Sequence, residues 1–163
     1  MKKVLWAPWR IDYILSEKET GCIFCKKPGE NNDLENLILY RGKFSFVIMN
    51  RYPYNSGHLM VVPYRHVSEF EELGDNELLD VNKLLRFSIS ILKKEMNPDG
   101  FNVGLNLGKA AGAGIDEHLH YHIVPRWIGD TNFMPVFSDT RVVPQSLKDT
   151  YANLKKHFQE IKI

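Results

Sequence analysis

The sequence predicts an α+β fold with an antiparallel sheet of about five strands, one long helix and a C-terminal helix. Two segments, 75–96 and 145–161, place apolar residues at helical spacing. Short apolar runs predict the strands, at 37–40, 44–49, 58–62, 101–107 and 118–124. A chain of 163 residues that is 44% hydrophobic is long enough for one sizeable core, so we expect a single domain over residues 1–163.

Both predicted helices have clear ends. The long helix is followed by Asn-Pro-Asp-Gly at 97–100, and Ser146 is placed to cap the second helix. We expect the apolar stripe of the long helix to pack on the sheet through Leu78, Val81, Leu85, Ile89, Leu92 and Met96. The second helix should dock in the same way, through Leu147, Tyr151, Leu154, Phe158 and Ile161. His157, near the end of that helix, is expected to be a solvated or helix-terminus residue and not a metal ligand.

The remaining segments show little periodicity. Residues 1–35 look irregular, with a plain loop at 28–33. Arg-Gly-Lys at 41–43 predicts a turn between the first two strands, and residues 141–143 are strand-like.

Three histidines alternate with apolar residues in the segment 118–124. This pattern predicts a strand with His118, His120 and His122 on one face, while the core side carries Leu119, Tyr121 and Ile123. The chain has six histidines in all, so a row of three is a strong signal. We interpret the row as a reaction centre.

Two other interpretations of the row stay open. Neighbouring positions on one strand face lie roughly 6.6 Å apart and the outer pair about 13 Å apart, whereas zinc holds nitrogen ligands at about 2.0–2.1 Å. A catalytic metal bound by all three rings is therefore disfavoured. The other interpretation is a structural row, in which every ring is hydrogen-bonded and none reacts.

Imidazole offers a nucleophile, a proton donor and a hydrogen-bond orienter near its ordinary pKa of about 6.5. These properties suit phosphorus chemistry, because attack by the central His120 splits a difficult displacement into two easier steps. His122 is then placed to protonate or position the leaving phosphate.

Other motifs accompany the row. Residues 50–63 read Asn-Arg-Tyr-Pro-Tyr-Asn-Ser-Gly-His-Leu-Met-Val-Val-Pro, Asn106 is followed by Gly108, and Pro-Arg-Trp at 125–127 continues the row. Together these elements resemble the histidine-triad (HIT) nucleotide hydrolases and transferases over roughly residues 22–130. The resemblance implies the HIT-like fold.

Two segments outside the central motifs point to a subgroup within this family. Segments 5–13 and 129–135 are similar to a bacterial subgroup, the diadenosine tetraphosphate phosphorylases. The layout that the resemblance implies has an N-terminal arm at 1–35, a HIT core at 36–127 and a C-terminal extension with a helix at 128–163.

The resemblance also assigns roles to individual residues. It implies catalytic histidines in three roles: the nucleophile His120, the leaving-group residue His122, and the orienting residues His118 and His58. Asn50 would contact ribose hydroxyls and Asn106 a phosphate oxygen. Glycines allow the close approach that an anion needs, and further phosphate contacts are expected from the backbone N–H groups of Gly108, Gly112 and Gly114.

One stretch departs from the commoner family pattern. Many members carry Gly-Gln-Ser or Gly-Gln-Thr before the triad, whereas residues 111–115 here are Ala-Gly-Ala-Gly-Ile. If the missing side chains place a water, their loss puts simple hydrolysis in doubt and leaves room for inorganic phosphate.

The predicted function is therefore cleavage of dinucleoside polyphosphates through a covalent nucleotidyl-histidine, with phosphate as the acceptor. The alternatives are a hydrolase of dinucleoside polyphosphates or nucleoside phosphoramidates that uses water, a nucleotide-binding regulatory module, and a metalloenzyme.

Cys22 and Cys25 have the two-residue spacing that lets both thiolates bind one zinc ion. The resemblance implies His66 and His118 as the other two ligands of a structural zinc site. Two free thiols or a redox-active pair are the alternatives.

Charge and hydropathy limit the partners. A net charge of +1 gives no broad basic surface, so we expect no nucleic-acid partner, and no segment is long enough to span a membrane. The opening lacks an apolar signal region, which favours the cytoplasm. The resemblance implies a nucleotide substrate and a homodimer, and we expect no organic cofactor.

Overall fold

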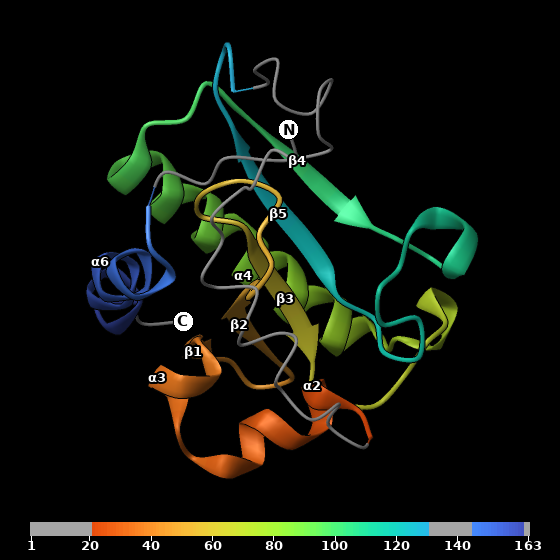
Figure 1. The fold of residues 1–163 in the computed structure, drawn as a ribbon. Coiled ribbons are helices and arrows are strands. Elements are labelled where there is room, and N and C mark those ends of the chain that lie inside the picture. The colour runs from red at the N-terminus through yellow and green to blue at the C-terminus, as the bar shows by residue number, and fades with distance from the viewer. Residues whose placement is uncertain (1–20, 131–144, 162–163) are drawn as a thin grey trace, which may run out of the picture.

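The computed structural model describes residues 21–130 and 145–161 (Figure 1). The motif at 5–13, most of the motif at 129–135 and the strand-like residues 141–143 lie outside the described residues.

The described core is a five-stranded antiparallel sheet in the order β1-β2-β3-β5-β4. Its strands are β1 (Ile38–Arg41), β2 (Ser45–Met49), β3 (Leu59–Pro63), β4 (Gly100–Leu105) and β5 (Tyr121–Arg126). Every residue of β2 and β3 is buried, because these central strands are covered on both faces. The predicted α+β class and the antiparallel sheet are confirmed.

The long helix α4 (Asp75–Met96) crosses behind the sheet (Figure 1) and contacts β2, β3 and β5. It ends as predicted, with Asn97 in the left-handed region at φ 45°. Its buried face is rotated relative to the predicted stripe and consists of Asp80, Val81, Leu84, Ser88, Ile91 and Leu92. The polar Asp80 is tolerated there because its carboxylate accepts hydrogen bonds from the Phe44 N–H and the Ser45 hydroxyl. Half-buried side chains flank this face, including Leu78, Leu85, Ile89 and Met96.

The C-terminal helix α6 (Leu147–Gln159) contacts β1 and α4. Ser146 caps it as predicted, since its hydroxyl accepts from the Asp149 N–H. His157 lies in the last turn of α6, in line with the helix-terminus interpretation, and its Nε2 lies 2.8 Å from Glu95 Oε2 on α4. None of the described helices is long and apolar enough to cross a membrane.

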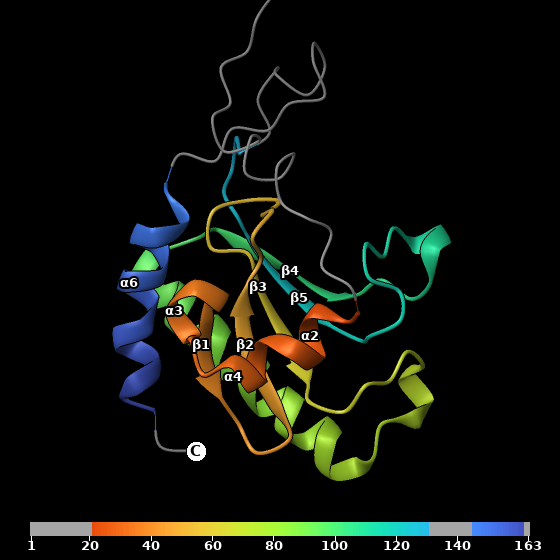
Figure 2. The same cartoon turned by 60° about the horizontal axis from the view of Figure 1, so that its bottom comes forward.

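Residues 1–35 were predicted to be irregular, and for the described residues 21–35 this was wrong. They form α2 (Ile23–Lys26), the short 3-10 helix η1 (Lys27–Glu30) and α3 (Asp33–Asn36). Figure 2 shows α2 and α3 in front of the sheet and α4 behind it. Such four-residue helices are too short for periodicity to reveal, and their ends depend on tertiary contacts such as the ion pair of Asp33 with Arg41.

Candidate active site

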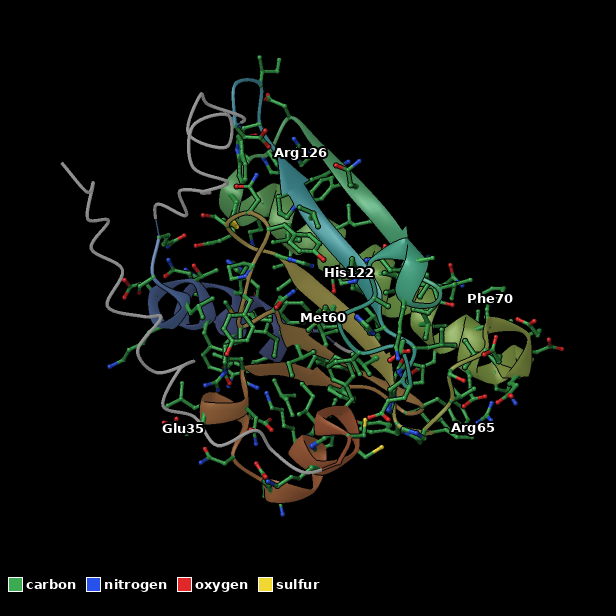
Figure 3. All side chains as sticks on the ribbon, turned by 45° about the vertical axis from the view of Figure 1, so that its right-hand side comes forward. Glu35, Met60, Arg65, Phe70, His122 and Arg126 are labelled. Atoms are coloured by element: carbon green, nitrogen blue, oxygen red, sulfur yellow. The ribbon has the colours of Figure 1, made fainter. Side chains whose placement is uncertain are left out.

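The histidine row does not lie on one regular strand. β5 begins at Tyr121, so His122 is in the sheet whereas His118 and His120 precede it. Figure 3 places His122 beside Met60, its partner on β3. Before β5, the Leu119 N–H donates to Val67 O at 2.7 Å instead of continuing the ladder. The predicted strand 118–124 is therefore too long at its start. The three imidazoles are all buried and lie close together, since Phe24 contacts both His118 and His120, and His120 lies next to His122.

His58 and His122 are joined by a hydrogen bond of 2.9 Å between His58 Nε2 and His122 Nδ1. Its direction follows from a neighbour, because the Tyr54 N–H donates to His58 Nδ1 at 3.1 Å. His58 Nδ1 must therefore be the acceptor, so His58 Nε2 carries the proton and donates it to His122. His122 then carries its own proton on Nε2. Among the described residues, this buried nitrogen has no hydrogen-bond partner.

His120 has the opposite tautomer. Its Nδ1 lies 2.9 Å from the carbonyl oxygen of His118, and a carbonyl only accepts, so Nδ1 carries the proton. The lone pair of neutral His120 is therefore on Nε2. The ring centroids of His120 and His122 are 4.8 Å apart. A nucleophilic nitrogen and a hydrogen-bond donor thus stand on adjacent rings, which is the arrangement that displacement at phosphorus needs.

Two aromatic residues pack against this histidine cluster. The buried Phe24 ring from α2 lies 5.1 Å from the His120 ring and 5.5 Å from the His118 ring, centroid to centroid. The Tyr54 ring lies 4.7 Å from His58 and 5.8 Å from His122. These apolar walls help to exclude water from the imidazoles.

A second cluster adjoins the first and contains all four predicted metal ligands. The ligand atoms of Cys22, Cys25, His66 and His118 lie within 4.8 Å of one another. His118 Nδ1 is 3.2 Å from Cys22 Sγ and 3.3 Å from His66 Nδ1.

These residues fit a tetrahedral zinc site. A zinc ion with sulfur at about 2.3 Å and nitrogen at about 2.0–2.1 Å needs ligand atoms about 3.3 to 3.8 Å apart. Four of the six separations between these ligand atoms are 3.2 to 3.5 Å, close to that range. The His118 Nε2–H donates to the Pro63 carbonyl at 2.9 Å, which leaves the lone pair on Nδ1 facing the cluster.

The comparisons with known proteins agree with this geometry. The model of the HIT domain matches residues 31–127, well over half of the chain. The chain belongs to the HIT family. It is also 44% identical over 155 residues to a Mycobacterium tuberculosis protein named AP-4-A phosphorylase, covering 90% of this chain and 79% of that one. The family and this relative confirm the predicted class, an enzyme of the nucleotidyltransferase or hydrolase type.

Solved HIT structures share the fold. A hypothetical histidine triad nucleotide-binding protein from Sulfolobus tokodaii superposes with a TM-score of 0.67 at 29% identity, over 85% of this chain and 90% of that chain. A zinc-bound histidine triad family protein from Mycobacterium smegmatis superposes with a TM-score of 0.69 at 22% identity, over 86% and 94% of the two chains.

Burial keeps the imidazoles of His58, His120 and His122 neutral. Burial, and then the neighbouring His122, lowers the pKa of His58 to about 3. Burial and the nearby His120 lower the pKa of His122 to about 4. Burial also lowers the pKa of His120 below its ordinary value, against the hydrogen bond to the His118 carbonyl. All three rings are thus neutral at pH 7, as their hydrogen bonds require.

Folding stability should therefore fall in mild acid. The folded protein holds His58 neutral down to about pH 3, whereas the unfolded chain protonates this group near pH 6.5. Between these values the unfolded state binds more protons, so stability is greatest above about pH 6.5 and is lost as the pH falls. From pH 7 to pH 5, His58 alone should cost about 2 kcal/mol.

Urea unfolding of the wild type and of His58→Asn at both pH values measures this contribution, with the two proteins matched in metal content. The variant should lose about 2 kcal/mol less than the wild type over this interval. An identical loss in both proteins would contradict a neutral, buried His58.

The structure brings one of the predicted substrate-binding residues, Asn50, next to His58. Asn50 follows β2, and its side-chain Nδ2 lies 3.3 Å from His58 Nδ1, while its Oδ1 accepts from the Tyr52 N–H. Asn106 is half-buried directly after β4. In the turn that follows, Gly108 and Gly112 have φ of 75° and 86°, which explains glycine there. Gly114 has an ordinary φ and open space at its Cβ position. Contacts of these residues with ribose or phosphate stay predictions.

Sequence reasoning missed the residues that hold the loop 50–57 in place. The Asn55 side-chain N–H₂ donates to Pro125 O and to Asp130 Oδ2, and Arg126 forms two hydrogen bonds to Asp130. This network fixes the Tyr54 N–H that sets the tautomer of His58. Asn55 lies 70 and 75 residues from its two partners in sequence, so no local pattern reveals the network.

Proposed function

We propose that this HIT protein is a dinucleoside polyphosphate phosphorylase that acts on diadenosine tetraphosphate and produces ADP and ATP. The observation that carries the proposal is the pair of opposite tautomers. An unprotonated Nε2 on His120 lies beside a buried Nε2–H on His122 that has no partner within residues 21–130 and 145–161. The substrate is inferred from the relative named AP-4-A phosphorylase.

The first step forms a covalent intermediate. His120 Nε2 attacks the phosphorus nearest one adenosine and forms an N–P bond, while the bond from that phosphorus to the bridging oxygen breaks. The leaving group is ATP. His122 Nε2–H donates to the departing oxygen and stabilises the charge that develops on it.

The second step regenerates the enzyme. An oxygen of inorganic phosphate attacks the adenylyl phosphorus, the N–P bond breaks, and ADP leaves with the His120 lone pair restored. Residues 111–115 present only small or aliphatic side chains in the turn before the triad. This leaves space beside the backbone for an anion, whereas no side-chain amide or hydroxyl in that stretch orients a water.

A structural zinc ion is part of the proposal. Cys22, Cys25, His66 and His118 would hold it, and it would cross-link the arm at α2 to the segment before β5. Bound metal neutralises the thiolates and stabilises the folded state. The chemistry at phosphorus needs no contact with this ion.

We also propose a homodimer that joins through β4. This strand is an edge of the sheet, and its side chain Val103 and the following Leu107 are 46% and 51% exposed. An exposed apolar edge is ready for pairing with another strand. The proposed location is the cytoplasm, where a reducing environment keeps cysteines available to metal.

Product analysis tests the acceptor. Purified protein is incubated with diadenosine tetraphosphate, with and without millimolar phosphate, and the nucleotides are separated by chromatography. We expect ADP and ATP only when phosphate is present, because the adenylyl group then leaves on phosphate. Equal amounts of AMP and ATP regardless of phosphate would show that water is the acceptor, and the protein would be a hydrolase.

A further inference from the structure

The cysteine pair also brings an aromatic side chain to the nucleophile. Phe24 stands between Cys22 and Cys25 in α2 and is 1% exposed. Its ring contacts both His118 and His120, with centroid separations of 5.5 and 5.1 Å. The same helical turn therefore places the two thiols in the cluster and the Phe24 ring against His120.

His118 makes a second connection between the two clusters. Its Nδ1 faces the thiols and His66, and its Nε2–H is fixed by Pro63 O. Its backbone carbonyl accepts the proton of His120 Nδ1 at 2.9 Å. The residue that would bind the metal is thus the residue that sets the tautomer of the nucleophile.

We propose that the cluster of Cys22, Cys25, His66 and His118 controls the nucleophile, because it fixes the orientation and tautomer of His120 through the His118 carbonyl and the Phe24 ring. Phe24 and His118 are positioning residues in this scheme. The inference rests on the proposed function, and it assigns to the metal site a control of the reaction beyond cross-linking the arm. Metal loss then lowers kcat in a protein that is still folded.

The His118 carbonyl and the Phe24 ring constrain different properties of His120. The carbonyl selects which nitrogen carries the proton, and the Phe24 face restricts rotation of the ring. The two long helices α4 and α6, which pack on the sheet, contain none of the four cluster residues. Activity and folding should therefore separate when the cluster is emptied.

Nitrogen NMR of the imidazoles tests the first connection without any substrate. Protein labelled with ¹⁵N histidine is compared with bound zinc and after chelation, at one fixed pH. With zinc, we expect His120 to show one protonated and one unprotonated nitrogen, assigned with His120→Ala. Without zinc, the two resonances should move toward the average of the two tautomers. Unchanged His120 resonances in folded, zinc-free protein would overturn the inference.

A substitution that leaves the four ligands intact tests the second connection. Phe24→Leu should keep full zinc content and lower kcat about 10- to 100-fold, since small displacements of a reacting group have effects of that size. KM should change much less, because the buried Phe24 ring offers little surface to substrate. The matched control is Phe158→Leu, which removes the same volume from an equally buried site on α6 and should leave kcat unchanged.

The outcomes separate the inference from the proposed function. If both phenylalanine variants retain zinc and wild-type kcat, control by the arm is wrong even when the phosphorylase assignment holds. If the wild type shows no activity with diadenosine tetraphosphate, the function fails, and the NMR comparison still decides the coupling. If chelation unfolds the protein, Phe24→Leu in the zinc-loaded enzyme decides it.

Discussion

His120→Ala should lower kcat for diadenosine tetraphosphate cleavage by at least about 10⁴-fold, the scale seen when a covalent nucleophile is removed. The reason is specific to this ring. Its Nδ1–H is held by the His118 carbonyl, which leaves the lone pair on Nε2. Alanine offers no atom that can attack phosphorus, so the covalent route closes. Steady-state assays of ATP release measure the effect.

Nucleotide binding should survive the same substitution, because the nucleophile contributes little to ground-state affinity. Isothermal titration with a non-hydrolysable analogue measures binding. His157→Ala serves as the control. His157 lies on α6 and contacts Glu95 of α4, away from the triad, so this variant should retain full kcat. Turnover by His120→Ala within tenfold of the wild type would eliminate His120 as the nucleophile.

His122→Asn should lower kcat about 10²- to 10⁴-fold, the range for loss of a general acid. The substitution removes the Nε2–H that the structure leaves buried and unpaired among the described residues. The amide of asparagine can still accept the hydrogen bond from His58, so the cluster should keep its packing. The loss then reports on leaving-group stabilisation.

A substrate with an acidic leaving group distinguishes this role from general damage. The p-nitrophenyl ester of AMP releases a phenolate that needs little protonation, so His122→Asn should be impaired far less with this ester than with diadenosine tetraphosphate. An equal loss with both substrates would show that His122 acts by another means. His120→Ala should be inactive with both.

The regular elements could be predicted because their signals are local. Apolar spacing and the Asn97 stop defined α4 to within the observed range, and Ser146 marked the start of α6. Burial of particular helix positions was less predictable. Asp80 faces the core because Phe44 and Ser45, at the start of β2 and more than 30 residues away in sequence, supply hydrogen-bond donors.

The histidine row shows where local pattern stops being sufficient. Alternation identified the right residues, since Leu119, Tyr121 and Ile123 do enter the core. It implied a strand at His118 and His120, where the chain instead bonds to Val67. That contact joins segments 52 residues apart in sequence, so it cannot be predicted from the local pattern of residues 118–124.

The metal ligands were predicted from spacing and resemblance, and the structure brings all four together. The contact of Phe24 with His120 was not predicted. From the sequence alone, the Ile-Phe pair between the two cysteines indicates only apolar side chains that would be buried in the core. This contact is seen only in the folded structure, because α2 and the triad are almost 100 residues apart in sequence.

The central claim is a covalent adenylyl group on His120, and rapid-quench mass spectrometry tests it most directly. The enzyme is mixed with excess diadenosine tetraphosphate without phosphate, quenched in alkali to protect the N–P bond, and digested. The account predicts one adenylyl group on the peptide that carries His120, its discharge to ADP after a chase of phosphate, and no adduct in His120→Ala. Product formation at the full rate with no adduct at any time, or an adduct on another residue, would contradict it.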